Sequence, residues 1–262
     1  MTHSFRSIVI VLLLSLLVSP VDSISSMGSG ISLAEVNELI TEQAEVSDSQ
    51  RFEQYIELLY SDFDLVDTDL ELSVFRYAMV GYYNLKRSKA LRDLSTITII
   101  DYEKSANIPR LYVLDLSKKE ILYHTLVSHG RNSGNEYAKK FSNVPQSYAT
   151  SLGFYVTKHT YSGKHGYSLR LEGWDKGFNC KAEKRAIVMH AANYVSKDFA
   201  KKHGRIGRSL GCPALPVAVT KPLINQIKNR SCLFSYYPDG NYLSKSKHLN
   251  FSSALAEFIV AS

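Results

Sequence analysis

Short runs of β-branched and aromatic residues recur from Thr96 onward, and they restrict the fold of this chain more than any other feature. Such residues favour strands, because branched and flat side chains pack well on a pleated surface. The runs cover residues 96–100, 110–116, 120–128, 153–157, 167–171, 186–190 and 232–237. Residues 117–119 separate the second run from the third, a length typical of a β-hairpin. We therefore expect a body built mainly on a β-sheet.

Helical patterns flank and interrupt this body. Residues 196–202 and 217–228 have helical character, and Thr220 and Pro222 indicate that the second helix begins slightly after Val217. Between Ser32 and Arg92 apolar residues recur at helical spacing, with one stripe formed by Phe52, Tyr55, Ile56, Leu59 and Tyr60. The sequence thus predicts an α+β fold with a small helical segment at residues 31–93, a mainly β domain at residues 94–240 and a C-terminal tail at residues 241–262.

The N-terminus has the layout of a secretory signal peptide. Arg6 precedes an apolar run from Ile8 to Val18, which Pro20 and small serine residues follow. The alternative is a membrane anchor, but a spanning helix needs roughly 18 or more apolar residues, and this run has about 11. We expect residues 1–25 to be a signal peptide, the protein to be exported to the periplasm or cell envelope, and no integral membrane segment to remain after signal removal.

Charge is distributed unevenly along the chain. Residues 31–75 contain twelve acidic residues against Arg51 alone, whereas residues 76–262 contain 29 Lys and Arg against 12 Asp and Glu. A basic body suits nucleic acid, an anionic membrane face or an acidic wall polymer. Export argues against nucleic acid, so we expect no nucleic-acid partner.

An unusual loop surrounds one of the three cysteines, which are Cys180, Cys212 and Cys232. An odd number leaves at least one thiol unpaired or paired between molecules. Gly211 precedes Cys212 and permits a sharp turn, so that both backbone amides can converge where an oxyanion forms. Pro213 follows and excludes a regular helix there. This pattern favours a reactive cysteine, although a buried inert cysteine is the commoner case.

A histidine base and flanking positive charge would activate such a thiol. His190 ends the apolar run 186–189 and is the best candidate for the base, while Arg205 and Arg208 supply charge. A lone histidine after a strand is more often structural. No two histidines are spaced at i, i+4 and no CxxC motif occurs, so we expect no metal site. No phosphate-binding glycine motif occurs either, and we expect no cofactor.

Four motifs together resemble the murein L,D-transpeptidase catalytic domain family, in its YkuD-like branch. They are HGRNSG at residues 129–134, SLGFY at 151–155, MHAA at 189–192 and GRIGRSLGCPALP at 204–216. The resemblance covers about residues 96–237 and implies a mainly β fold that acts on peptidoglycan stem peptides. It implies Cys212 as nucleophile and His190 as base, with the acyl group of a tetrapeptide donor held as a thioester and passed to the amine of a second stem.

The substrate side of the site is less defined by sequence. We predict catalytic roles for Cys212, His190 and Gly211, and substrate binding by His129, Arg205, Arg208 and Ser209, the arginines holding the diamino-acid or terminal carboxylate. The alternative interpretation of His129 is a structural residue that closes a strand. The family commonly has histidine two residues before the cysteine, and here that position is Leu210. The alternatives are a murein L,D-carboxypeptidase or endopeptidase, and a non-catalytic wall-binding protein of the same fold.

Overall fold

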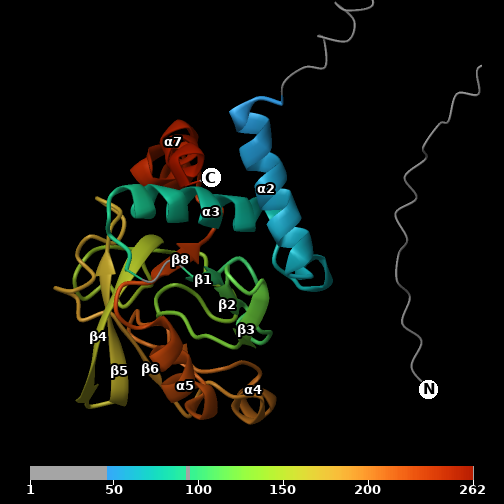
Figure 1. Ribbon diagram of the computed structural model, residues 1–262. Coiled ribbons are helices and arrows are strands. Elements are labelled where there is room, and N and C mark those ends of the chain that lie inside the picture. The colour runs from blue at the N-terminus through green and yellow to red at the C-terminus, as the bar shows by residue number, and fades with distance from the viewer. Residues whose placement is uncertain (1–45, 93–94, 262) are drawn as a thin grey trace, which may run out of the picture. The chain divides into compact units, whose positions relative to one another are not determined.

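The computed structural model describes residues 46–92 and 95–261 (Figure 1). The predicted signal peptide and the first part of the predicted helical segment lie outside the described residues. Among the described helices, none is long and apolar enough to cross a membrane.

Within the described residues, eight strands form one mixed sheet in the order β3-β2-β1-β8-β4-β5-β6-β7. The pairs β1–β8 and β6–β7 are parallel, and all other neighbours are antiparallel. The last strand in sequence therefore lies inside the sheet, between β1 and β4. The strands are β1 Thr96–Asp101, β2 Leu111–Asp115, β3 Glu120–Thr125, β4 Gly153–Gly163, β5 Gly166–Gly173, β6 Val188–Ala191, β7 Ala214–Leu215 and β8 Cys232–Tyr236.

Helices cover both faces of the sheet (Figure 1). On one face α3 packs against β1 and β8, with α2 and α7 packed on α3, and on the other face α5 packs against β1, β5 and β6. A capping box of Ser47 and Gln50 starts α2. The helical elements are α2 Asp48–Asp62, η1 Leu65–Asp67, α3 Leu72–Arg87, α4 Lys197–His203, α5 Val217–Ile227, α6 Gly240–Lys245, η2 Lys247–Leu249 and α7 Phe251–Ala261.

The central strands are apolar on both sides because both faces are covered. In β8, Phe234 belongs to the core beneath α3, while Leu233 belongs to the core beneath α5. Gly81 lets α3 approach the sheet closely, since a Cβ there would lie 1.8 Å from the ring of Phe154. Strands that are buried on both faces consist mainly of apolar residues, and the runs of β-branched and aromatic residues in the sequence therefore identified them.

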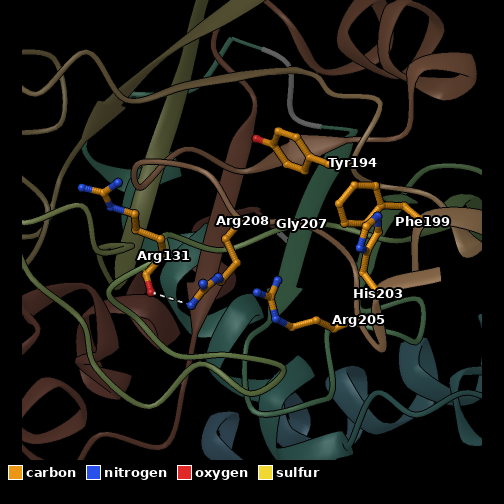
Figure 2. A pocket seen from close by; sticks show the side chains of 7 residues that line it. All are labelled: Arg131, Tyr194, Phe199, His203, Arg205, Gly207 and Arg208. Carbon is orange, nitrogen blue, oxygen red and sulfur yellow. Dashed lines mark hydrogen bonds between the residues drawn. The ribbon is translucent and has the colours of Figure 1, made fainter. Parts of the chain in front are cut away.

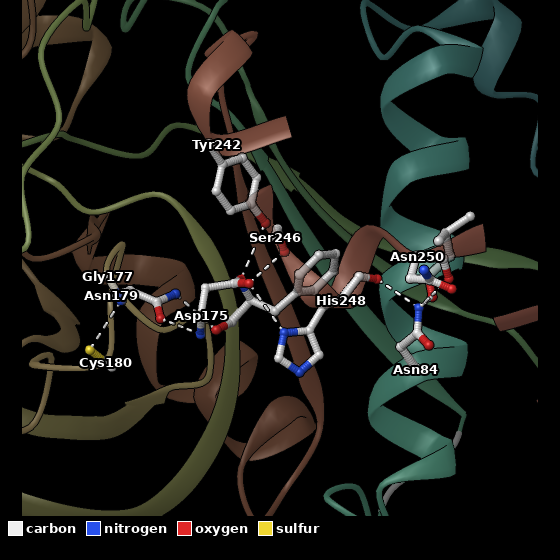
Figure 3. Close-up of polar contacts among 11 residues, drawn as sticks. Asn84, Asp175, Gly177, Asn179, Cys180, Tyr242, Ser246, His248 and Asn250 are labelled. Atoms are coloured by element: carbon white, nitrogen blue, oxygen red, sulfur yellow. Dashed lines mark hydrogen bonds and ion pairs between the residues drawn. The ribbon is translucent and has the colours of Figure 1, made fainter. Parts of the chain in front are cut away.

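A buried carboxylate attaches the C-terminal helices to the sheet (Figure 3). Asp175, which is 2% exposed, follows β5 and accepts hydrogen bonds from the Phe154 amide at 2.6 Å and the Tyr242 hydroxyl at 3.2 Å. Its other oxygen accepts from the Ser246 hydroxyl at 2.5 Å and faces Nδ1 of His248 at 3.1 Å. A buried carboxylate is tolerated because its lone pairs are occupied in this way. The cluster fixes α6 and η2 against the loop after β5.

The observed elements confirm the predicted α+β, mainly β fold. All seven predicted strand runs contain a strand, and β2 and β3 form the predicted hairpin. Six runs match the observed ends within three residues, whereas β4 extends six residues beyond the predicted end, to Gly163. The predicted late start of the 217–228 helix is wrong, because α5 begins at Val217. The Thr220 hydroxyl donates to the Pro216 carbonyl oxygen at 2.8 Å within the first turn, and Pro222 is accommodated inside the helix.

Candidate active site

Cys212 lies between α4 and β7, and its sulfur faces the start of β6. The Val188 amide donates to Sγ at 3.5 Å, and the thiol donates to the Ala186 carbonyl oxygen at 3.7 Å. Burial raises the pKa of the Cys212 thiol, while the Val188 amide and the Arg185 charge oppose that rise. The thiol is therefore protonated at neutral pH and needs a base to become a nucleophile.

The turn before Cys212 depends on glycine and on one serine. Gly211 has φ of +123°, a conformation that only glycine adopts without strain. The Ser209 hydroxyl accepts from the Gly211 amide at 3.0 Å and donates to the Cys212 carbonyl oxygen at 2.6 Å. The Gly211 amide is thus occupied, whereas the Cys212 amide has no hydrogen-bond partner within the described part of the chain. Of these two amides, only that of Cys212 is available to a bound oxygen.

His190 is held in β6 by its neighbours. Its Nδ1 donates to the Ala191 carbonyl oxygen at 2.9 Å, which leaves the lone pair of Nε2 available. The ring stacks on His165, from the β4–β5 turn, with ring centroids 4.3 Å apart and planes at 19°. Burial, and then the neighbouring His165, lower the pKa of His190. The imidazole is therefore neutral at neutral pH, as a general base must be.

The structure brings the predicted base and nucleophile onto adjacent segments. In the parallel pairing of β6 with β7, His190 lies opposite Ala214, two residues after Cys212, and Val188, two residues before His190, contacts Sγ. No hydrogen bond joins His190 to Cys212 among the described residues, and the sulfur instead contacts the Val188 amide and the Ala186 carbonyl oxygen. Catalytic hydrogen bonds are often long before substrate binds.

His129 and Ser209 lie inside the protein. His129 is 1% exposed. Nδ1 of His129 accepts a hydrogen bond from Nη2 of the buried Arg110 at 2.8 Å, and Nε2 of His129 donates to the Gly134 carbonyl oxygen at 3.4 Å. Burial and the Arg110 charge lower the pKa of His129 to about 3. The Ser209 amide in turn donates to the His129 carbonyl oxygen at 2.9 Å. Both residues support the loop that carries Cys212.

Arg205 and Arg208 line a pocket of about 380 Å³ together with Tyr194, Phe199 and His203 (Figure 2). Arg208 donates through Nη1 to the Arg131 and Gly134 carbonyl oxygens and to the Asn135 amide oxygen, and Arg205 donates to the Ile206 carbonyl oxygen. Within the described chain, neither arginine forms an ion pair with a carboxylate. The pocket is therefore positively charged and suited to an anion.

Tyr194 relates this pocket to the thiol. Burial raises the pKa of Tyr194, and the charge of Cys212 raises it further. Tyr194 thus lines the arginine pocket and is influenced electrostatically by Cys212. Leu210, at the position where histidine is common in the family, is 57% exposed and donates nothing to an oxyanion.

The other two cysteines have different surroundings, and all three thiols are free. Cys180 is exposed, and hydrogen bonds from the Gly177 amide and the Asn143 side chain lower its pKa. Cys232 lies in β8, where burial raises its pKa strongly. Cys180 is thus the thiol that any labelling experiment on Cys212 must remove. Among the described residues, no group of three or more His, Cys, Asp or Glu side chains is placed to hold a metal ion.

Two residues near the site, His165 and Arg185, were not predicted from sequence. His165 stacks on His190 only because the β4–β5 turn is carried to the end of β6. Arg185 lies beside Gly211 in space but 26 residues away in sequence. Neither position has a local signal, since both depend on long-range packing.

The L,D-transpeptidase catalytic domain model matches residues 66–236, about two thirds of the chain. The chain belongs to this family. The match begins before α3 and includes every strand of the sheet. The family confirms the resemblance that the motifs around His190 and Cys212 indicated. No curated protein matches the chain.

Similar solved structures include members of the family. An L,D-transpeptidase from Mycobacterium smegmatis is 13% identical, with a TM-score of 0.35, over 55% of this chain and 59% of its own. The helical cell shape determining protein Pgp2 from Campylobacter jejuni is 13% identical, with a TM-score of 0.41, over 69% and 63%. An L,D-transpeptidase from Stackebrandtia nassauensis is 11% identical, with a TM-score of 0.33, over 71% and 92%. The chain thus spans about three fifths of the length of the first of these structures.

Proposed function

We propose that this chain is a cysteine acyltransferase, an L,D-transpeptidase that acts on peptidoglycan stem peptides with Cys212 as nucleophile and His190 as base. The observation that carries the proposal is the parallel pairing of β6 with β7, which places the histidine strand beside the segment that holds the cysteine. The lowered pKa of His190 and the raised pKa of Cys212 fit a neutral base and a neutral thiol on adjacent segments. Such a pair reacts by general-base catalysis when substrate arrives.

The first step forms a thioester. Nε2 of His190 accepts the thiol proton as Sγ of Cys212 attacks the carbonyl carbon that precedes the terminal residue of the donor stem. The Cys212 amide donates to the developing oxyanion, where a preorganised donor is worth about 10²–10³-fold in rate. The carbon–nitrogen bond then breaks, the leaving amine takes the proton from His190, and the acyl group stays on sulfur.

The second step transfers the acyl group. The amine of a second stem attacks the thioester carbon, His190 accepts a proton from that amine, and the Cys212 thiolate leaves as the new peptide bond forms. The thiolate then regains the proton from His190. Water in place of the amine would release a free acid, which is the carboxypeptidase outcome.

Arg205 and Arg208 are proposed to bind a carboxylate of the stem. Both guanidinium groups line the pocket beside Tyr194 and have hydrogen-bond donors that no described residue uses. A planar guanidinium pairs with a carboxylate through two parallel hydrogen bonds. The burial of His129 and Ser209 gives these two residues a supporting role instead of direct substrate contact. The signal-like pattern at residues 1–25 supports export to the cell envelope, where the substrate occurs.

The test is product analysis with defined muropeptides. Purified protein is incubated with a tetrapeptide donor and a second stem, and products are separated by mass into cross-linked dimer and hydrolysed monomer. We expect cross-linked dimer with the wild type and with Cys180→Ala, none with Cys212→Ala, and about 10²–10⁴-fold less with His190→Ala. Equal activity of the two cysteine variants would refute the assignment of Cys212, and hydrolysed monomer alone would establish the carboxypeptidase.

A further inference from the structure

Arg185 lies in the loop before β6, and its guanidinium group binds a single segment of the chain. Four acceptors of residues 142–151 surround it. They are the Ser142 carbonyl oxygen at 2.6 Å, the Ala149 carbonyl oxygen at 2.6 Å, the Ser147 hydroxyl at 3.2 Å and the Ser151 hydroxyl. A flexible ammonium group has three donors on one atom and cannot reproduce this planar fork.

The same guanidinium reaches the loop that carries Cys212. A Cβ at Gly211 would lie 3.3 Å from Nη2 of Arg185 and 2.8 Å from the Ala149 carbonyl oxygen. The missing side chain therefore lets both groups pack against the residue before the nucleophile. Arg185 forms no ion pair with a carboxylate within the described chain. Its charge is therefore not neutralised by a described carboxylate, and it lies against the residue before Cys212.

We propose that Arg185 is a positioning residue for the nucleophile: its charge stabilises the Cys212 thiolate, and its hydrogen bonds hold residues 142–151 against Gly211. The charge of Arg185 favours the thiolate against the effect of burial, and Tyr155 and then Cys212 favour charged Arg185 against its own burial. Arg205 and Arg208 face the pocket beside Tyr194 and leave this role to Arg185. The inference rests on the proposed function only in taking Cys212 as the reactive group.

The experiment measures the rate of alkylation of Cys212 by iodoacetamide as a function of pH. The exposed Cys180 is first replaced by Cys180→Ser, and Cys232 is protected by burial. Arg185→Gln removes the charge but keeps amide donors, whereas Arg185→Lys keeps the charge but loses the fork. We expect Arg185→Gln to move the pH profile upward, so that the rate at pH 7 falls roughly threefold to tenfold. Arg185→Lys should leave the position of the profile unchanged.

A matched control is Arg170→Gln, because Arg170 is exposed on β5 and stacks on Tyr161. It should leave the profile unchanged. A profile of Arg185→Gln that coincides with the wild type would overturn the inference. If Arg185→Gln does not fold, the test uses Arg185→Lys, which retains the charge. An upward-shifted pH profile of Arg185→Lys would also overturn the inference. Adding Cys212→Ala separates the two proposals: labelling that persists there refutes the reactive cysteine itself, whereas a reactive Cys212 insensitive to Arg185 refutes only this inference.

Discussion

Replacing Gly211 by alanine tests whether the shape of the turn before Cys212 is necessary. The residue has φ of +123°, and a Cβ there would lie 2.8 Å from the Ala149 carbonyl oxygen and 3.1 Å from the Ile187 side chain. A non-glycine residue in such a conformation costs about 1–3 kcal/mol. Displacing a packed backbone carbonyl costs about 1–3 kcal/mol more. We therefore expect Gly211→Ala to lower the free energy of unfolding by about 2–6 kcal/mol, a large share of the roughly 5–15 kcal/mol of a typical domain.

The control for that prediction is Gly177→Ala. Gly177 also has positive φ, +88°, but a Cβ there meets nothing within 4 Å. It should show the conformational cost alone, about 1 kcal/mol. Urea unfolding gives both free energies, and iodoacetamide labelling in the Cys180→Ser background reports the thiol. Equal destabilisation of the two variants, or unchanged labelling in folded Gly211→Ala, would refute the argument that close packing at Gly211 sets the position of Cys212.

Two further predictions concern titrating groups. The stacked ring of His165 lowers the pKa of His190, so His165→Ala should raise that pKa. The acidic limb of the pH profile of kcat/KM should then move to higher pH. An unmoved limb would show that His165 has no influence on the base. Burial raises the pKa of Asp101 to about 6, so the carboxyl group is easier to bury protonated, and the wild type loses stability as pH rises from about 4 through 6. Asp101→Asn should remove this loss and be more stable than the wild type at pH 7 by up to about 3 kcal/mol. Urea unfolding of both proteins at pH 4 and pH 7 checks this. If the difference in unfolding free energy between variant and wild type is the same at both pH values, the raised pKa of Asp101 is contradicted.

Much of the fold was predictable because burial on both faces leaves a simple signal. The runs that became β1, β2 and β8 are rich in β-branched and aromatic residues and are buried at every position, and each was located within two residues of its observed ends. The turn at Gly211 was also predictable, since glycine before cysteine and proline after it restrict the backbone locally. The family resemblance connected this turn to His190, and the family model confirms the resemblance.

What sequence could not supply depends on contacts between distant segments. The strand β7 is two residues long, too short for any periodicity, and exists through its pairing with β6. Asp175 is one acidic residue among many until four partners from β4 and the C-terminal helices surround it. The buried Arg110 likewise occurs within a strand pattern, and its role beside His129 appears only when two loops meet. Asp175 and Arg110 are thus polar side chains whose roles arise from their tertiary neighbours.

The segment that carries Cys212 is held at both ends, and this determines which partner can move. At one end Gly130 bridges to Ser209, and at the other Ser128 exchanges hydrogen bonds with Ala214 through its amide at 2.9 Å and its hydroxyl at 3.3 Å. Only residues 210–213 span the two anchors, so the backbone of Cys212 has little freedom. The imidazole of His190 is fixed by the Ala191 carbonyl oxygen and by His165, which belongs to a two-stranded turn extending beyond the core. If Cys212 and His190 react as proposed, we therefore expect the thiol to approach the imidazole by rotation of the Cys212 side chain about a fixed backbone, while the His190 ring keeps its place.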